Sequence, residues 1–172
     1  MENSEQQSKR QTRVYVAGAY SADNVIEVLQ NMRVGMKAAK DVLLAGFAPF
    51  APWFDHYFSL MLDEGESLTV GQYYQYSLAW LEASDCMVIV SGCSGTQRQT
   101  YCAHCDLRLD MCDLSGCASC PRCHGQDYRE QLVPDFTSKG VLAEYIRAQE
   151  LGIPIYRTLK DLFAREPRWR ER

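Results

Sequence analysis

The order of short apolar runs and longer periodic segments most constrains the fold of this chain. Arg13 to Gly18 is a β-rich run that ends in glycine. From Val25 to Gly46 apolar residues recur at three- and four-residue spacing, as on one face of a helix. The same alternation continues, with strands expected at about 47–50, 87–90 and 154–156 and helices expected at about 69–81, 140–151 and from 159. Strands that alternate with helices predict a parallel sheet with helices on both faces.

The predicted fold class is a three-layer α/β domain of the Rossmann-like or flavodoxin-like type. Met87 to Val90 is continuously apolar, as expected of a central strand that is buried on both faces. Residues 53–68 have no clean period and are expected to form a loop with a helical turn. In such sheets ligands bind beyond the carboxyl ends of the strands. The loops that begin at Gly18, Ala51 and Ser91 meet at that edge, so we expect the ligand site there.

Length and composition fit one such domain with an insertion. The 172 residues are 47% hydrophobic, and a formal net charge of -4 provides no broad basic field for nucleic acid. Residues 1–12 are polar and contain neither a signal-peptide pattern nor a membrane span, so we expect a disordered tail and a cytoplasmic protein. We expect the α/β domain to span 13–164 and a short charged tail to follow at 165–172.

Crowded cysteines mark the insertion, which we place at 93–136. Six of the eight cysteines fall between positions 102 and 123, and without an export signal such crowding indicates metal rather than disulfides. Cys102 and Cys105 form one C-x2-C pair, and Cys120 and Cys123 form another. This spacing is close to that of zinc ribbons, in which four thiolates hold one structural Zn²⁺.

Other donors in the same segment leave the ligand set open. Cys112, Cys117, His104 and His124 are surplus to one four-ligand site, so a different choice of four or a second ion is an alternative. An iron–sulfur cluster and redox-active thiols are further alternatives. The insertion leaves the carboxyl end of the strand at 87–90, so we expect it to overhang the ligand cleft as a lid or a partner-docking element.

A second motif begins the helix that follows the insertion. Ser138 can cap this helix, and Glu144 lies one turn beyond Gly140 on the same face. The first N–H groups and the Ser138 hydroxyl could hold a phosphate. A carboxylate beyond them could attack the anomeric carbon of a sugar, as in retaining glycosidases. On pattern alone, a glutamate in a helix is more often a solvated or salt-bridged residue.

Four motifs together carry a resemblance to a known superfamily. They are Val14-Tyr-Val-Ala-Gly18, Ala45-Gly-Phe-Ala-Pro-Phe50, Trp80-Leu-Glu-Ala-Ser-Asp-Cys-Met-Val-Ile-Val90, and Ser138-x-Gly140-x-x-x-Glu144 followed by Leu151-Gly-Ile-Pro154. In the same order, they resemble the nucleoside 2-deoxyribosyltransferase-like superfamily. The last motif is similar to that of the 2′-deoxynucleoside 5′-phosphate N-hydrolases. The resemblance implies that Ser138 contacts a 5′-phosphate, that Glu144 is the nucleophile and that the protein is a homo-oligomer.

One departure from that family concerns the general acid. In the N-hydrolases an aspartate three residues before the tryptophan of the equivalent helix protonates the leaving base, and that position is Ser77 here. A hydroxyl cannot give up a proton as a carboxylic acid does. Asp55 and His56, after the second strand, and Asp63 further along are candidate substitutes, although each is also explained as an ordinary loop residue.

A second departure lies in the loop after the first strand. The N-hydrolases carry a serine and an arginine in this phosphate loop, whereas this chain has Ala19, Tyr20 and Ser21. We take Gly18 and Ser21 as candidate substrate contacts. Tyr20 is a candidate to stack on a base or a sugar, and the alternative is that it simply packs.

Two classes of function follow from these motifs. The first is hydrolysis of the N-glycosidic bond of a nucleoside or nucleoside 5′-monophosphate, or (deoxy)ribosyl transfer, with Glu144 as nucleophile. The second is a nucleotide-binding or sensing adaptor without chemistry, which uses the zinc insertion to bind a protein or nucleic acid. A zinc-stabilised scaffold without a small-molecule ligand is a third alternative. No membrane partner is expected.

Overall fold

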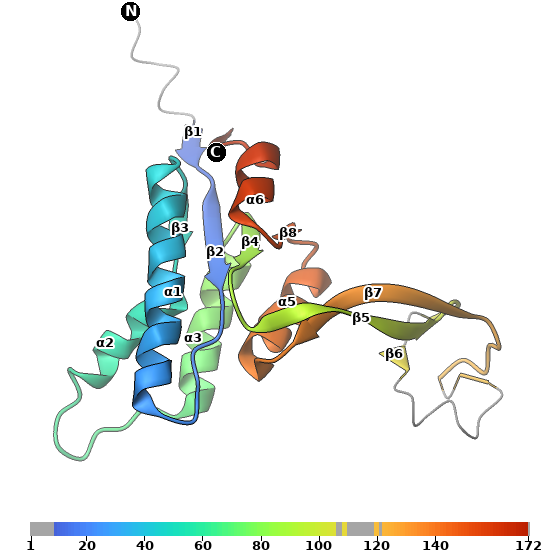
Figure 1. Cartoon of the computed structure of the whole chain (residues 1–172), viewed down its shortest axis with the longest axis horizontal. Coiled ribbons are helices and arrows are strands. Elements are labelled where there is room, and N and C mark those ends of the chain that lie inside the picture. Colours follow the sequence, from blue (N-terminus) through green and yellow to red (C-terminus); the bar gives the residue numbers. More distant parts are fainter. Residues whose placement is uncertain (1–8, 106–107, 110–118, 121, 172) are drawn as a thin grey trace, which may run out of the picture. The chain divides into compact units, whose positions relative to one another are not determined.

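The computed structural model describes residues 9–105, 108–109, 119–120 and 122–171. Contacts divide the chain into two compact units, one made of Met1–Gly92 and Thr137–Arg172 and the other of Cys93–Phe136. The second unit spans the same residues as the insertion expected from the cysteines (Figure 1).

A four-stranded parallel sheet forms the centre of the first unit. Its strands are β2 (Arg13–Ala17), β3 (Ala48–Phe50), β4 (Cys86–Ile89) and β8 (Ile155–Tyr156), in the order β3-β2-β4-β8. Every neighbouring pair is parallel. The prediction of an α/β unit built on a parallel sheet is therefore confirmed.

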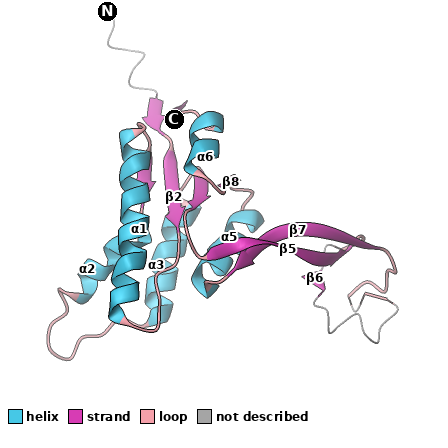
Figure 2. Cartoon of the chain, viewed as in Figure 1, coloured by secondary structure: helices cyan, strands magenta, loops and turns pink. Residues whose placement is uncertain are grey.

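Helices connect these strands, as Figure 2 shows. They are α1 (Val25–Leu44), the 3-10 turn η2 (Pro52–Asp55), α2 (His56–Ser59), α3 (Val70–Glu82), α5 (Lys139–Glu150) and α6 (Leu159–Arg165). Side chains satisfy the N–H groups at the helix starts. Asn24 accepts from Glu27 N before α1, and Thr69 forms a capping box with Gln72 before α3. After α1, Gly46 takes a φ of 92°, which suits glycine.

Alternation along β2 sends its side chains to opposite faces of the sheet. Val14 and Val16 are fully buried in a core that includes Val42 of α1 and Leu162 of α6. Each buried valine stabilises the fold by about 1.5–3 kcal/mol. Tyr15, between the two valines, points the other way and reaches α5. One face of β2 therefore builds the core, and the other face brings a polar group to α5.

The chain ends differ from the expected tails where they are described. β1 (Lys9–Gln11) pairs antiparallel with β9 (Trp169–Glu171), within segments we expected to be tails. Arg10 helps to fix β1 to the rest of the unit, because its Nη2 lies 2.7 Å from Oδ1 of the partly buried Asp85. Strands of three mostly polar residues give no periodic signal. Residues 1–8 and 172 lie outside the described residues.

The second unit contains an antiparallel sheet that the sequence pattern did not predict. Its strands are β5 (Cys93–Cys102), β6 (Arg108–Leu109) and β7 (Tyr128–Phe136), in the order β6-β5-β7. β5 is rich in Gln, Thr and Ser, and it lacks the apolar alternation that marks a half-buried strand. No helix in the described part of the chain is both long and apolar enough to cross a membrane.

Candidate functional site

A cavity of about 720 Å³ lies in the first unit at the edge expected to bind ligands. Its walls come from the loop after β2, from η2, from α3 and from the first turns of α5. The size is typical of small-molecule sites. The cavity brings together Gly18, Tyr20, Ser21, Asp55, Ser77, Ser138, Gly140 and Glu144, all of which were singled out from the sequence.

Glu144 is a buried carboxylate with one unpartnered oxygen in the wall of this cavity. Glu144 is only 7% exposed, and the Tyr15 hydroxyl donates a hydrogen bond to its Oε1 at 2.6 Å. The other oxygen, Oε2, is buried and has no hydrogen-bond partner among the described residues. Burial raises the pKa of Glu144 to about 7, the Tyr15 hydrogen bond works against this rise, and the charge of Asp55 adds to it.

Ser77 supports this carboxylate through Tyr15. It lies on α3, is 6% exposed, and interacts with the Tyr15 hydroxyl in a way that lowers the Tyr15 pKa. Burial raises the pKa of Tyr15 well above 10, and the neighbouring Glu144 raises it further. Tyr15 therefore stays protonated and remains a donor to Glu144. Ser77 therefore lies beside Tyr15, at the position where the N-hydrolases that the sequence resembles carry an acid.

Asp55 is the second carboxylate that lines the cavity. It ends η2 and is 7% exposed, and burial raises its pKa to about 6 although the neighbouring His56 lowers it. His56 makes a different contact, because its Nδ1 lies 3.1 Å from the Tyr20 hydroxyl. Asp63 is exposed in the loop before α3. Among the three candidate substitutes for the acid, Asp55 is the one in the cavity wall.

The start of α5 offers N–H groups to the cavity. Ser138 is the N-cap, and its Oγ accepts from Val141 N at 3.4 Å. Lys139 and Gly140 also line the cavity, and N–H groups of a first helical turn have no partner within the helix. Gly92 fixes the residues just before this turn. Its carbonyl accepts hydrogen bonds from Thr137 N and Ser138 N at 2.9 and 3.2 Å.

Gly18 and the loop after β2 owe their shape to close packing. A Cβ on Gly18 would lie 2.6 Å from Ser91 Oγ and 2.9 Å from the Trp53 ring, so a larger residue would displace both. Trp53 is almost fully buried, and its Nε1 donates to Ala19 O at 3.1 Å. Gly18 is therefore required for packing, whereas Tyr20 and Ser21 present side chains at the cavity wall.

Several residues of the site escaped the sequence analysis. Trp53, Tyr73, Tyr74 and Lys139 line the cavity, and Tyr15 bonds to Glu144 behind the wall. A tyrosine among the aliphatic residues of a buried strand was a signal that could have found Tyr15, because a buried phenol needs a partner. Trp53, Tyr73 and Tyr74 lie in segments where aromatic rings also pack in ordinary cores. The sequence pattern therefore did not distinguish a ligand-binding ring from a core ring.

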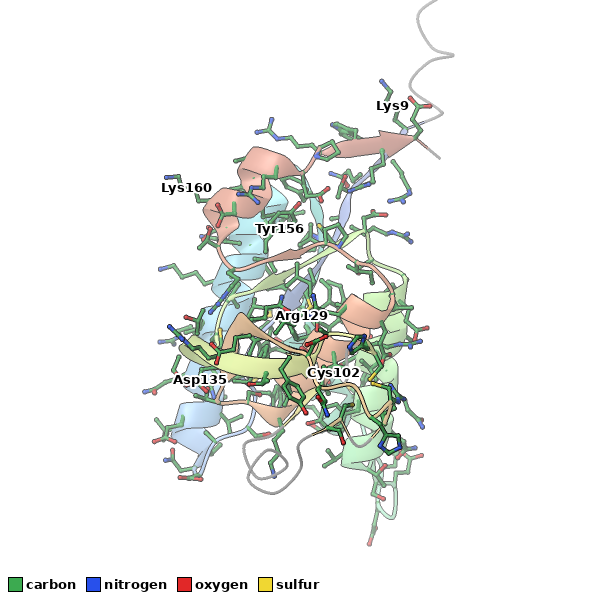
Figure 3. All side chains as sticks on the ribbon, turned by 90° about the vertical axis from the view of Figure 1, so that its right-hand side faces the viewer. Lys9, Cys102, Arg129, Asp135, Tyr156 and Lys160 are labelled. Carbon is green, nitrogen blue, oxygen red and sulfur yellow. The ribbon has the colours of Figure 1, made fainter. Side chains whose placement is uncertain are left out.

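Four thiols meet in the second unit. The Sγ atoms of Cys102, Cys105, Cys120 and Cys123 all lie within 4.8 Å of one another, and Cys102 at the end of β5 is labelled in Figure 3. Cys102 and Cys123 are 3.4 Å apart and Cys105 and Cys120 are 3.6 Å apart, much longer than a disulfide of about 2.05 Å. A tetrahedral zinc site with Zn–S distances of about 2.3 Å separates its sulfurs by about 3.8 Å. The cluster could therefore bind a metal ion.

The backbone around the second cysteine pair forms a tight turn. His124 N donates to Cys120 O, and Cys120 N donates to Gly125 O, both at 2.8 Å. Burial opposes ionisation of Cys120, but nearby N–H groups and thiols outweigh burial and lower its pKa to about 6, which favours the thiolate that binds metals. His104 is 54% exposed and lies 3.3 Å from Asp127. Cys112 and Cys117 lie outside the described residues.

Comparisons of the chain with protein-family models, with curated proteins and with solved structures found no match.

Proposed function

We propose that the first unit cleaves the N-glycosidic bond of a nucleoside or nucleoside 5′-monophosphate, by hydrolysis or by (deoxy)ribosyl transfer, with Glu144 as nucleophile. One observation carries the proposal. Glu144 is buried in the wall of a ligand-sized cavity, with Oε1 held by Tyr15 and Oε2 unpartnered. Leaving a buried carboxylate oxygen unpaired costs stability, so a role in ligand chemistry is a reasonable explanation.

Each wall element has a part in this reaction. Tyr15 fixes one oxygen of Glu144 so that Oε2 is the attacking atom at C1′. The start of α5, with Ser138, Lys139 and Gly140, accepts the 5′-phosphate, because first-turn N–H groups and a lysine favour an anion. Tyr20, Tyr73 and Tyr74 pack against the heterocycle or the sugar. Water or a second base then resolves the glycosyl-enzyme ester.

We also propose that this unit is a three-layer domain of the nucleoside 2-deoxyribosyltransferase-like type. The four motifs of the sequence analysis support the family assignment. The strand order supports the finer fold, because numbering the parallel strands along the chain gives 2-1-3-4, the beginning of the flavodoxin-like order. The cavity lies at the carboxyl end of β2, beside the point where that order reverses.

For the four-thiol cluster we propose structural Zn²⁺. The donor set is all sulfur, and two C-x2-C pairs supply it. Bound zinc would crosslink the end of β5 to the turn before β7 in a unit too small for a large core. Thiolates also suit a reducing compartment, in agreement with the proposed cytoplasmic location.

A second candidate function is a nucleotide-binding adaptor without catalysis, in which the second unit contacts a protein or nucleic acid. Ser77 in the place of an acid favours it, as does a compact insertion of 44 residues, from Cys93 to Phe136. The two functions differ in one property, since only the enzyme requires the Glu144 carboxylate for turnover.

A substrate panel separates these candidates. The protein is incubated with ribo- and deoxyribonucleosides and their 5′-monophosphates, and free base is measured by chromatography. The enzyme releases base, and the isosteric Glu144→Gln variant loses at least about 100-fold in rate. Nucleotide binding by calorimetry without base release from any compound would instead support the adaptor.

A further inference from the structure

Asp55 is the second buried carboxyl of the cavity wall, and helix capping does not account for it. Asp55 is 7% exposed and lines the same cavity as Glu144. It occupies the N-cap position of the short helix α2, where an aspartate usually accepts a hydrogen bond from the first turn. Here its side chain makes no such bond. Burying a carboxyl is unfavourable, so the position of Asp55 calls for another explanation.

Trp53, two residues before Asp55, ties this carboxyl to the hydrophobic core. Trp53 is 1% exposed and belongs to the core cluster, and its Nε1 donates to Ala19 O at 3.1 Å. A Cβ on Gly35 of α1 would lie 2.2 Å from the Trp53 ring, so helix and ring are in close contact. The turn η2 joins Trp53 directly to Asp55. Asp55 is therefore held on an anchored turn, as the precise placement of a catalytic group requires.

The other proton donors of the described wall are weaker acids than Asp55. They are the hydroxyl groups of serine, threonine and tyrosine side chains and the ammonium group of Lys139. His56 is not among the residues that line the cavity, and its Nδ1 lies 3.1 Å from the Tyr20 hydroxyl. Glu144 must be ionised to attack C1′. Asp55 is thus the strongest acid that the described wall offers to a leaving base.

Asp55 and Glu144 are electrostatically coupled. Burial raises the pKa of Glu144 to about 7, the Tyr15 hydrogen bond lowers it, and the charge of Asp55 raises it. Burial raises the pKa of Asp55 to about 6, and the charge and backbone of His56 lower it. Because two like charges oppose double ionisation, the pair holds a single proton over a range of pH near neutrality. The form with that proton on Asp55 and the charge on Glu144 has both an acid and a nucleophile.

We propose that Asp55 is the general acid and base of this cavity and that the substrates carry ordinary, uncharged nucleobases. This inference rests on the proposed function. An uncharged base is a poor leaving group unless a proton reaches it as the C1′–N bond breaks. Retaining glycosidases use a pair of carboxyls in the same way, one as nucleophile and one as acid and then base. Asp55 supplies the proton that a serine at position 77 cannot.

The first half of the reaction uses Asp55 as an acid. The unpartnered Oε2 of Glu144 forms a bond to C1′ while the C1′–N bond breaks, and the electron pair of that bond passes to the base. The Asp55 proton moves to a ring nitrogen or the carbonyl oxygen of the base. The base leaves neutral, and Asp55 becomes a carboxylate.

The second half uses the same residue as a base. Water attacks C1′, the C1′–O bond to Glu144 breaks, and its electron pair restores the Glu144 carboxylate. The surplus proton of the water moves to Asp55, which returns to its starting form. In transfer, the N–H of a second base takes the place of the water.

First-turnover kinetics test the acid role. The full-length protein, in excess, is mixed with the 5′-monophosphates of adenine, guanine, cytosine and uracil nucleosides, in ribo and 2′-deoxyribo forms, and with the 4-nitrophenyl glycosides of the same sugar phosphates. 4-Nitrophenolate is a stable anion, so its departure needs no acid. Asp55→Asn should slow the first release of base at least about 100-fold and keep the first release of nitrophenolate within about threefold of the wild type. Asp63→Asn, which alters an exposed carboxyl before α3, is the matched control and should change neither rate.

Azide tests the base role in a second variant. In Asp55→Ala the 4-nitrophenyl substrate still forms the glycosyl-enzyme, but no base activates water. Azide needs no deprotonation, so it should raise steady-state turnover at least about tenfold and give a glycosyl azide with the configuration of the substrate. Azide should have neither effect on the wild type or on Asp63→Asn.

Four outcomes overturn the inference, and they differ in what they leave standing. Unchanged base release in Asp55→Asn removes the role of Asp55, and release of nitrophenolate but of no base by the wild type removes the substrate class. Equal losses on both kinds of substrate, in a variant that circular dichroism shows to be folded, mean that Asp55 only shapes the cavity. These three results leave a glycosidase in place. Release of neither base nor nitrophenolate by the wild type removes the proposed function, and the inference with it.

Discussion

Glu144 is buried and has one oxygen without a hydrogen-bond partner. From these two properties we predict how the free energy of unfolding depends on pH. Its pKa rises from 4.5 to about 7 on folding, chiefly through burial. A carboxyl whose pKa is raised stabilises the fold below its unfolded pKa, and this contribution is lost as pH rises through about 7. Glu144→Gln, which cannot ionise, should therefore be more stable than the wild type at pH 8 by about 1–3 kcal/mol and should gain little at pH 4.5.

Urea unfolding of both proteins at the two pH values measures this difference. Glu150→Gln on the same helix is the matched control, because Glu150 is exposed and should show no comparable pH-dependent gain. Equal stability of wild type and Glu144→Gln at pH 8 would mean that Glu144 is not the strained group we describe.

Tyr15 carries a second prediction at the residue scale. Its hydroxyl stabilises the charged form of Glu144, so Tyr15→Phe should raise the pKa of Glu144 further. Base release near pH 6 should fall roughly 10–100-fold, and less at pH 8, because a hydrogen bond to a charged group contributes about 1.5–3 kcal/mol. The pH–rate profile measures the shift, with Tyr20→Phe as control. A profile whose ascending limb stays in place would contradict the role of Tyr15.

At the residue scale the sequence allowed part of the site to be predicted. Ser138 caps α5, and Gly140 and Glu144 lie within it. Their spacing along the chain therefore predicts that they lie close together in the structure. The hydrogen bond between Tyr15 and Glu144, and the effect of the Asp55 charge on Glu144, join different elements. Such contacts depend on how strands and helices pack, which local spacing does not encode.

At the scale of elements, the four-thiol cluster should govern the order of the second unit. Changing Cys102 and Cys105 to serine removes two of its four donors, so bound zinc should fall from about one ion per chain to near zero. Amide exchange should then increase in β5 and β7, whereas β2 and β4, which belong to the other unit, should keep their protection.

Elemental analysis and hydrogen exchange provide the two readings. Cys93→Ala is the control, since Cys93 is not one of the four clustered thiols, and its zinc content should match that of the wild type. Full zinc content in the double variant would point to a different ligand set.

Elements differed in how well the sequence predicted them. α1, α3 and α5 have periodic apolar residues and side-chain caps, so both their existence and their approximate ends were expected. β5 and β7 are held by pairing with each other over most of their length, and their polar residues carry no burial pattern. β1 and β9 pair across nearly the whole chain, and three-residue strands are too short to detect.

At the scale of the whole molecule, exposed apolar side chains support the proposed homo-oligomer. Val25, Ile26 and Leu29 on α1 are 49% exposed or more, and Leu60 and Met61 after α2 are 61% and 74% exposed. Clusters of such side chains are more common at interfaces than on monomers. We expect a dimer or larger assembly in analytical ultracentrifugation, and Ile26→Glu combined with Leu29→Glu should shift it toward monomer. Lys37→Glu, a change at an exposed position elsewhere on α1, serves as control, and a wild type that sediments as a monomer would contradict the expectation.

The central claim is that Glu144 attacks the anomeric carbon, and trapping the glycosyl-enzyme tests it most directly. A nucleotide with fluorine at C2′ destabilises the positive charge that develops during hydrolysis of the ester, so the intermediate should accumulate. Mass spectrometry of peptides should then show the sugar phosphate attached to the peptide that contains Glu144, with stoichiometric base release and with neither event in Glu144→Gln. Base release that persists in Glu144→Gln, or a sugar attached to another residue, would contradict the account.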